Sequence, residues 1–331
     1  MIRKIEKLLL AVLLAIMCFA GCNSGEDIAG KVDIGKVDTG KVDTGKIDTG
    51  KTDTGEIKTD TPDVVVNADK GWEITQYGPR DINSSFYTIY NEAEGLIVID
   101  GGWTEDADFV KDVISSYGGH VEAWILTHPH QDHIGAFNAV YPNPGEITVG
   151  DIYTVDMASP EDCLAVASWD SVEAYEDFQS LHIPDIKYLY PGDKMELCGL
   201  ELEVFSAFDD NVRIFSRDYL NDGSMMFKVS GKKESFLFCA DVGVSMSDFL
   251  LQKYGQQLKA DYLQMAHHGF GGLNDNFYST VAPAFAFFDA PDWLMYDTTG
   301  KYDTPEHVEL MQGMGSEIFS FSQGTNSILL E

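Results

Sequence analysis

Residues 121–133 read VEAWILTHPHQDH, an apolar run that leads directly into three histidines and an aspartate. The run VEAWIL has the length and continuous apolar character of a strand that is buried on both faces, as in sheets covered by helices. Side chains at the carboxyl end of such a strand point into the cleft where open α/β sheets place their sites. This stretch therefore predicts a layered fold of strands and helices with a polar site at one sheet edge.

The same order of buried strand and amphipathic helix recurs along the chain. GLIVID at residues 95–100 is an apolar run bounded by glycines, and TEDADFVKDVISSYG after it carries apolar residues at helical spacing. HIGAFNAVY predicts a second helix, and an irregular stretch with one helix near WDSVEAYEDFQSL reaches about residue 190. The remainder alternates between sheet and helix. We expect an α+β chain with two sheets and helices outside.

The first 21 residues have the features of a secretory signal peptide. MIRKIEK supplies positive charge, and LLLAVLLAIMCFA is an apolar stretch too short for a comfortable membrane span. FAGC, which ends at Cys22, resembles the lipobox of bacterial lipoproteins, with Phe19 where leucine is usual. The resemblance implies cleavage before Cys22 and lipid on its sulfur, hence an exported, outward-facing protein anchored to the cell membrane. The alternative is ordinary secretion, in which Cys22 has no such role.

Residues 22–63 contain a five-residue repeat of the form GKVDT, through roughly residues 30 to 55. The repeat has no aromatic residues and few large apolar ones, so burial cannot offset the entropy lost on ordering. We expect a flexible tether that would lift a domain off a membrane surface. A β-roll or a calcium-binding array is the alternative. One domain then occupies residues 64–331.

That domain is strongly acidic, with 13 lysines and arginines against 43 aspartates and glutamates. Capture of nucleic acid needs a basic surface, so nucleic acid is not expected as a partner. Neutral or cationic substrates suit this charge better. Three cysteines remain in the domain, Cys163, Cys198 and Cys239, and their wide spacing does not make a disulfide framework.

Four potential metal ligands fall within six positions: His128, His130, Asp132 and His133. Imidazole nitrogen and carboxylate oxygen are the ligands that zinc and similar metals prefer. Without a metal, three imidazoles and a carboxylate this close together would need many hydrogen bonds to be buried. We therefore expect one or two metal ions here. The alternative is an exposed polar loop with chance histidines.

These four residues complete the H-x-H-x-D-H signature, and about residues 70 to 331 resemble the metallo-β-lactamase superfamily. Asp100 in VIDGG, Asp241 in FLFCADVG and the histidines of MAHHG follow in the order of that family. The resemblance implies a four-layer αβ/βα sandwich of two mixed sheets, with a dinuclear site at one edge. LTHPHQDHIG, NDGSMMFKV, SFLFCADV and ADYLQMAHHG further resemble the hydrolase domain of ComEC-type competence proteins and the choline-phosphate esterases of bacterial surfaces. Both groups imply phosphodiester hydrolysis.

The resemblance also implies a role for each residue. Two divalent ions are expected, zinc first and manganese or iron as alternatives, held by two groups of ligands: His128, His130 and Asp241, and Asp132, His133, Asp241 and one late histidine. His268 is favoured as that late ligand, with His267 as a neighbouring proton donor. Asp132 orients or deprotonates the attacking water, and Asp100 orients a ligand histidine from behind.

One departure concerns the first group of ligands. The superfamily usually has another metal-binding histidine between His133 and the bridging aspartate, and here that interval contains only His182. The loop after LEVF reads SAFDDN, so Asp209 or Asp210 is an alternative ligand.

Aromatic residues near the end of the chain are candidates for substrate binding. Trp293 and Tyr296 fall in a predicted loop, and Tyr302 begins the sequence YDTP where the competence branch often has HP. The rings of Trp293 and Tyr296 would form a wall for a cationic or sugar group, and Tyr302 stands at the position of a leaving-group acid or a phosphate contact. Ordinary packing is the alternative.

We therefore expect a surface-anchored metallo-hydrolase, first of all a phosphodiesterase that attacks phosphorus with a metal-bridged hydroxide. Its substrate would be a small-molecule or cell-envelope phosphodiester. A lactonase or β-lactam hydrolase would use the same site. A non-catalytic metal- or ligand-binding lipoprotein would keep the fold, and the missing histidine favours that alternative.

Overall fold

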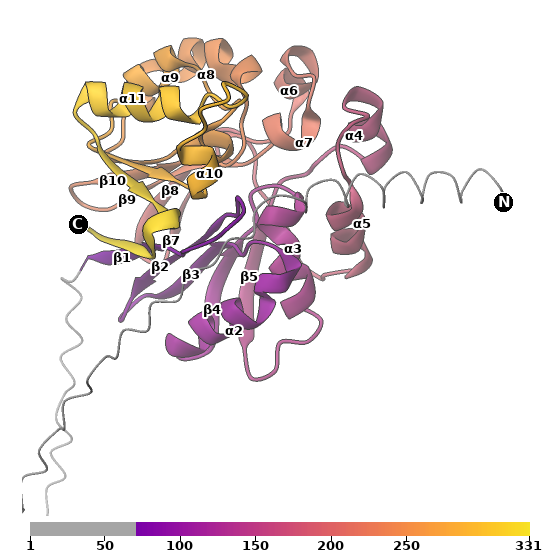
Figure 1. Ribbon diagram of the computed structural model, residues 1–331. Coiled ribbons are helices and arrows are strands. Elements are labelled where there is room, and N and C mark those ends of the chain that lie inside the picture. The colour runs from indigo at the N-terminus through magenta and orange to yellow at the C-terminus, as the bar shows by residue number, and fades with distance from the viewer. Residues whose placement is uncertain (1–70) are drawn as a thin grey trace, which may run out of the picture. The chain divides into compact units, whose positions relative to one another are not determined.

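Two seven-stranded sheets pack face to face in the computed structural model, which describes residues 71–331 (Figure 1). The predicted signal peptide, Cys22 and the predicted tether lie outside these residues. Helices cover the outer faces of both sheets, so the predicted α+β sandwich of two mixed sheets is confirmed. None of the helices in residues 71–331 is long and apolar enough to cross a membrane.

The first sheet combines an antiparallel side with a parallel side. Its strands in spatial order are β14 (Asn326–Leu330), β1 (Trp72–Gln76), β2 (Phe86–Asn91), β3 (Gly95–Asp100), β4 (His120–Ile125), β5 (Thr148–Thr154) and β6 (Lys187–Tyr188). Neighbours from β14 to β3 are antiparallel, and neighbours from β3 to β6 are parallel. β3 is buried from Leu96 to Asp100, as its apolar run predicts.

The second sheet has the same mixture. Its strands in spatial order are β13 (Glu317–Ser320), β12 (Phe285–Phe288), β11 (Tyr262–Gln264), β10 (Ser235–Phe238), β9 (Met226–Ser230), β8 (Leu200–Ser206) and β7 (Lys194–Leu197). Strands β7 to β10 pair antiparallel, and β10 to β13 pair parallel. The parallel strands therefore end at one edge of the sheet.

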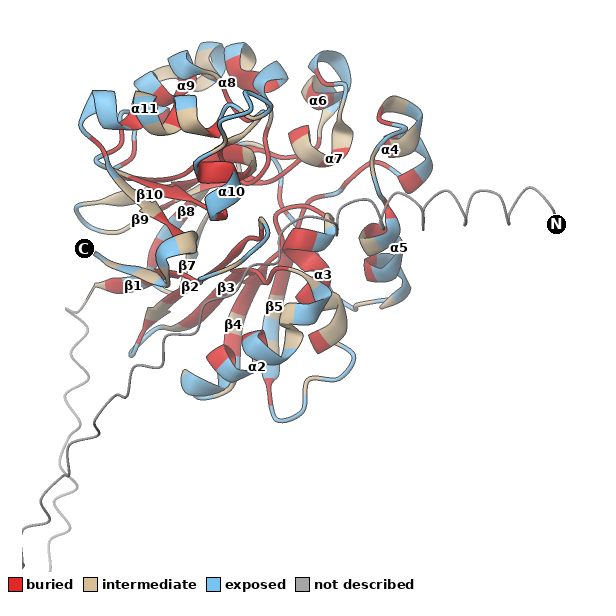
Figure 2. Cartoon of the chain, in the orientation of Figure 1, coloured by how far each residue is buried: buried red, intermediate tan, exposed pale blue. Residues whose placement is uncertain are grey.

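The helices lie outside the sheets and between their ends. They are α2 (Ala107–Ser116), α3 (Gln131–Val140), α4 (Pro160–Val166), α5 (Glu173–Ser180), α6 (Asp210–Phe215), α7 (Tyr219–Asp222), α8 (Ser247–Tyr254), α9 (Asp275–Val281), α10 (Asp292–Met295) and α11 (Thr304–Met314). Figure 1 shows α2 and α3 over the first sheet and α8, α9 and α11 over the second. The buried residues concentrate on the strands and on the inner sides of these helices (Figure 2).

Aromatic side chains fill the space between the sheets. The ring of Tyr87 on β2 meets Phe238 on β10 edge to face, with 5.4 Å between ring centroids, and Phe238 stacks on Phe236 at 4.2 Å. All three are buried, and burying one such side chain stabilises a fold by about 1.5–3 kcal/mol. These rings hold the two sheets in the arrangement that brings their strand ends together.

Several strands and helices lie where the sequence analysis expected none. β5, β6 and α4 fall inside the stretch expected to be irregular, and β14 follows the last predicted strand. The short helices α6, α7 and α10 were not expected either, and α10 includes Trp293, which was expected in a loop. β14 alternates between partly exposed and exposed residues before Leu330, so its sequence lacks a strong apolar run. Pairing with β1 rather than its own composition makes this segment a strand.

Gly135 on α3 gives a test of this packing. A Cβ at Gly135 would lie 2.6 Å from the backbone nitrogen of Thr104 and 2.9 Å from the carbonyl carbon of Trp103. Gly135→Ala should therefore lower the free energy of unfolding by about 1–3 kcal/mol, although alanine is the better helix former. Urea denaturation measures this change.

Gly313 on α11 is the matched control, because a Cβ there meets no atom within 4 Å. Gly313→Ala should leave stability unchanged or raise it by up to about 1 kcal/mol. If both variants gained stability, the close approach of α3 to residues 103–104 would be wrong.

Candidate metal centre

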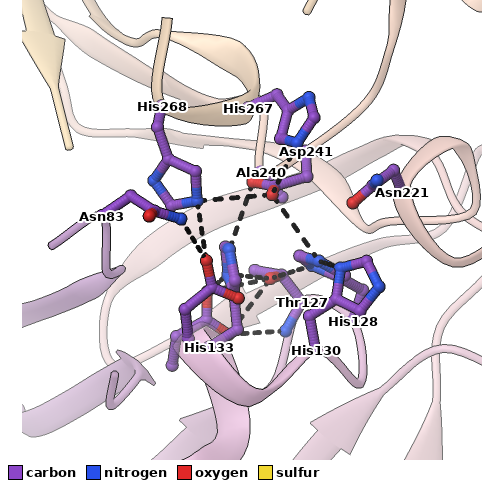
Figure 3. Close-up of polar contacts among 12 residues, drawn as sticks. Asn83, Thr127, His128, His130, His133, Asn221, Ala240, Asp241, His267 and His268 are labelled. Atoms are coloured by element: carbon purple, nitrogen blue, oxygen red, sulfur yellow. Dashed lines mark hydrogen bonds and ion pairs between the residues drawn. The ribbon is translucent and has the colours of Figure 1, made fainter. Parts of the chain in front are cut away.

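Loops that follow four strands of the two sheets carry the polar cluster of Figure 3. β3 ends at Asp100, and the His128–His133 segment follows β4 and opens α3. Asp241 follows β10, and His268 lies in the short 3-10 turn after β11. All four loops lie at carboxyl ends of strands, as the sequence predicts.

The side chains converge as two groups. His128, His130 and Asp241 form one group, and Asp132, His133 and His268 form the other; within each group one ligand atom per residue lies within 4.8 Å of the others. In the first group, Nε2 of His128 and Nδ1 of His130 are 3.0 Å apart.

Asp241 lies between the groups. Its Oδ1 is 3.2 Å from Nε2 of His133, and its Oδ2 is 3.5 Å from Nε2 of His268 and 3.8 Å from Nε2 of His128. One carboxylate thus faces imidazoles of both groups, which is the position the resemblance assigns to a bridging ligand.

The facing atoms fit divalent cations, because several of them have no hydrogen-bond partner. Nε2 of His133, Nε2 of His268 and Oδ1 of Asp241 are buried and make no hydrogen bond within the described residues. Leaving such a buried group unpaired costs about 1–3 kcal/mol. Nitrogen and oxygen atoms that converge in this way are the donor set that zinc, manganese and iron accept.

In each imidazole of the two groups, the ring nitrogen that faces away from the other ligands contacts a polar group of the protein. The contacts are 3.2 Å from His128 Nδ1 to Thr127 Oγ1, 3.1 Å from His130 Nε2 to Asp170 Oδ1, 2.7 Å from His133 Nδ1 to Asp100 Oδ2, and 3.1 Å from His268 Nδ1 to the Asp289 carbonyl oxygen. Such partners fix the orientation of a ligand ring and raise its basicity. The remaining nitrogens are therefore directed at one another.

Asp100 acts on the centre through other residues. Its buried carboxylate accepts hydrogen bonds from the backbone N–H and hydroxyl of Thr127, both at 2.8 Å, and contacts His133. Its backbone has a φ of 54°, in the left-handed region that non-glycine residues rarely adopt. Asp100 is thus a positioning residue that sets both the ring of His133 and the start of the histidine loop.

Two polar partners of the centre were not predicted from the sequence. Asp170, in the loop before α5, contacts His130, and Asn83 donates from Nδ2 to Oδ2 of Asp132 at 2.6 Å. They are 40 and 49 residues from their partners and belong to no motif. Only the folded chain brings them to the site.

Opposite charges within the cluster raise the pKa of its His268 and lower the pKa of its Asp132. Burial lowers the pKa of His268, but the charge of Asp241 and the contact with Asp132 at 3.2 Å outweigh burial and raise it to about 10. Burial raises the pKa of Asp132, but the contact with His268 and the charge of His133 outweigh it and lower the pKa to about 2. Without metal, the carboxylates are thus ionised and His268 is protonated at neutral pH.

A buried polar network supports two of the site loops. Asp289, which is fully buried, accepts from Tyr87 Oη at 2.6 Å, from Gln76 Nε2 at 2.7 Å and from Gln264 Nε2 at 3.0 Å. Gln264 also accepts, through Oε1, from the backbone N–H of Ala240 at 2.8 Å. The network therefore fixes the residue before Asp241 as well as the carbonyl that holds His268.

His267 differs from the other histidines. Its Nε2 lies 3.9 Å from Asp241 Oδ2, and it belongs to neither group of ligand atoms. Burial lowers the pKa of His267. The ring stacks at a tilt on Phe270, 4.4 Å between centroids, and Phe270 meets Tyr302 at 5.2 Å.

Tyr302 and Trp293, two of the three predicted substrate-binding residues, extend the row of rings that begins with His267 and Phe270. Tyr302 meets Trp293 at 5.6 Å, and Trp293 donates from Nε1 to the Asp81 carbonyl at 3.0 Å. Tyr296 is exposed and does not take part in the row. The aromatic wall thus consists of Phe270, Tyr302 and Trp293 beside His267.

The structure does not bring the three alternative ligands to either group. Asp209 caps α6 and accepts from Asn211 N at 2.8 Å, and Asp210 is exposed on the first turn of that helix. His182 lines a different pocket, together with Val155 and Ile183. Asp209 is engaged in local capping, Asp210 faces solvent and His182 lies at another pocket, so none of them replaces the missing histidine.

A pocket of about 220 Å³ opens beside His267. Its lining includes Trp169, Arg217, Asn221, Val244, His267 and Gly271. Arg217 donates to the Ser216 carbonyl from Nη1 and leaves its other donors for a ligand, and Trp169 is 74% exposed at the rim.

Comparison with known proteins agrees with this architecture. Residues 77–149 match the family model of the Metallo-beta-lactamase superfamily, and no curated protein sequence matches the chain significantly. The crystal structure of CmlA, a diiron β-hydroxylase from Streptomyces venezuelae, matches with a TM-score of 0.51 at 12% identity, over 79% of this chain and 54% of that chain. The protein therefore has the metallo-β-lactamase fold and spans about half the length of CmlA.

Two further solved structures are similar over part of the chain. The metallo-β-lactamase fold protein YhfI from Bacillus subtilis has 13% identity and a TM-score of 0.47, over 77% of this chain and 99% of that chain. BJP-1, a subclass B3 metallo-β-lactamase of Bradyrhizobium japonicum, has 18% identity and a TM-score of 0.37, over 57% of this chain and 73% of that chain.

Asp170→Asn should weaken metal binding by about 10–100-fold, because the ring of His130 loses the carboxylate that orients it. Equilibrium dialysis with elemental analysis measures the change. Asp177→Asn, an exposed aspartate on the nearby α5, is the control and should bind metal as the wild type does. Equal metal affinities in the wild type and both variants would show that Asp170 does not support metal binding.

Metal affinity should rise with pH between about pH 6 and 9, because a cation must displace the proton that His268 carries in the metal-free protein. Asp132, with a pKa of about 2, is already ionised over this range and adds no dependence. Competition with a chelator at several pH values measures the slope. An affinity independent of pH would contradict the raised pKa of His268.

Proposed function

We propose that this protein is a metal-dependent hydrolase that cleaves phosphodiesters. The observation that carries the proposal is the pair of ligand groups joined by Asp241 next to an open pocket. The metallo-β-lactamase fold is consistent with such a centre. The alternative of a non-catalytic binding protein accounts less well for six converging ligand side chains beside that pocket.

The residues suggest how two ions would be held. His128, His130 and Asp241 would bind one ion, and Asp132, His133 and His268 would bind the other with Asp241 between them. When bound, two divalent cations would lower the pKa of a water molecule toward neutrality and stabilise negative charge on the substrate. Zinc is proposed first, and iron is the alternative because the similar structure of CmlA is named a diiron enzyme.

His267 is placed for proton transfer. Its side chain is 22% exposed, lines the pocket and belongs to neither ligand group. The lowered pKa leaves a neutral imidazole at pH 7, which can accept a proton from water and deliver it to a leaving-group oxygen. Asp132 suits this task less, since a carboxyl with a pKa of about 2 is a weak base.

Arg217 supports phosphate over an uncharged carbonyl substrate. Guanidinium groups bind phosphate oxygens with paired N–H donors. Two acidic residues of the same pocket are already paired: Asp222 accepts from Ser216, Ser245 and Gly243, and Asp218 accepts from Asn221.

We further propose a small-molecule or cell-envelope phosphodiester as the substrate. The acidic domain disfavours nucleic acid, and the pocket is small. Lipid on Cys22 would place the domain outside the cell, at the membrane surface. The resemblance of the site motifs to ComEC-type hydrolase domains and choline-phosphate esterases supports the same reaction class.

The test combines metal content with turnover of bis-(p-nitrophenyl) phosphate by the purified full-length chain. We expect about two ions per chain, and His130→Ala and Asp241→Ala should lose both metal and activity by more than the roughly 10–100-fold cost of losing an outer partner. His120→Ala is the control, because His120 is exposed on β4 and its side chain contacts Thr148 and Glu122 rather than either ligand group.

Two other results would change the proposal. Hydrolysis of a cephalosporin or a lactone without any phosphodiester cleavage would move the substrate class to the alternative. A wild-type chain with neither metal nor turnover would identify a binding protein that keeps the fold without the chemistry.

A further inference from the structure

Asn221, on α7, has a buried amide oxygen without a partner. Its Nδ2 donates to Asp218 Oδ2 at 2.8 Å, which fixes which end of the amide is nitrogen. Its Oδ1 is buried and makes no hydrogen bond within the described residues. Figure 3 shows this oxygen turned toward the side of the centre where His128 and Asp241 lie.

The segment around Asn221 is tied to both loops that carry the first ligand group. Met225 N–H donates to the Thr127 carbonyl at 2.9 Å, directly before His128. Asp222 accepts from Gly243 N–H at 2.8 Å, two residues after Asp241. These bonds hold Asn221 between the His128 loop and the Asp241 loop.

Two acidic side chains near the first group are already engaged. Asp170 accepts from the N–H of Ser171 at 2.8 Å and contacts the outer nitrogen of His130. Asp218 accepts from the N–H and the side chain of Asn221. Of these side chains, only Asn221 keeps an oxygen that has no hydrogen-bond partner within the described residues.

We propose that Oδ1 of Asn221 is a ligand of the ion held by His128, His130 and Asp241. It would take the place of the histidine that the sequence lacks between His133 and Asp241. The inference rests on the metal binding proposed above, but not on the reaction. Asp218 is a positioning residue in this arrangement, because its bond to Nδ2 directs the oxygen inward.

A neutral amide oxygen makes this position different from an imidazole. Oxygen donors suit manganese better than nitrogen donors do, and an amide binds zinc less strongly than imidazole. The first ion should therefore be the weaker of the two when zinc is bound, because its group has a neutral amide where the second group has the carboxylate of Asp132. Substitution at Asn221 should affect that ion alone, since the second group has its own ligands.

The experiment measures stepwise binding of Zn²⁺, Mn²⁺ and Co²⁺ to the full chain by equilibrium dialysis, with the Co²⁺ absorption spectrum as a second readout. Asn221→Ala should weaken one of the two ions by about 10-fold or more and change the Co²⁺ bands, while the other ion keeps its affinity. Asn221→Asp keeps an oxygen at this position and should retain both ions.

Ser224→Ala is the matched control, since Ser224 Oγ is a second buried oxygen without a partner on the same segment. It should leave both affinities unchanged. Unchanged binding in Asn221→Ala, or an equal loss in Ser224→Ala, would overturn the assignment, as would a wild-type chain that binds no metal. A wild-type chain that binds two ions but cleaves nothing would refute the proposed reaction and leave the Asn221 test intact.

Discussion

The carboxylate of Asp289 is the interaction on which the arrangement of the centre depends. It lies buried between the sheets, and desolvation raises its pKa, so it is tolerated only because three side chains donate to it. Gln76 and Tyr87 come from the first sheet and Gln264 from the second. The polar bridge thus crosses an aromatic core and fixes the relative positions of the two sheets where the ligand loops begin. Removing one donor would leave a buried charge underpaired, so the cost would reach both the core and the centre.

The ligand side chains are arranged before any ion arrives. Each imidazole is tied to the protein by one nitrogen, and Asn83 and Asp170 add contacts from loops outside the motifs. This arrangement has an electrostatic cost, because the two carboxylates of Asp132 and Asp241 both lie beside His268. It also has a conformational cost, because His267 and His268 have φ values of 50° and 56°. Strain of this kind persists where the surrounding structure determines the conformation. The aromatic row beside His267 and the network under Asp289 supply that support.

The fold class and the ligand motifs could be predicted from the sequence, because both depend on the local pattern of apolar and polar residues. Apolar runs that end in polar residues predicted β3 and β4, and the spacing within residues 128–133 predicted a cluster of donors. β14 and β5 were missed because their sequences alternate weakly and become strands through their neighbours. Asp170 and Asn83 were missed because nothing near them in the sequence marks their role. Asn221 opens the stretch NDGSMMFKV, but it was not considered as a ligand from the sequence. Position in the sequence suggested Asp209 and Asp210 as ligands, but Asp209 caps α6 and Asp210 faces solvent.

The pairing of β1 with β14 has a mechanical consequence. Trp72 opens β1 and lies opposite Leu330 at the end of β14, so the two ends of the described chain leave the sheet from the same corner. Hydrogen bonds between antiparallel strands run across the strand direction. A pulling force applied through residues before Trp72 and after Leu330 would load these bonds one at a time, from Trp72–Leu330 toward Gln76–Asn326. β14 would therefore separate from β1 one residue pair at a time, while the parallel strands that carry the ligand loops remain folded.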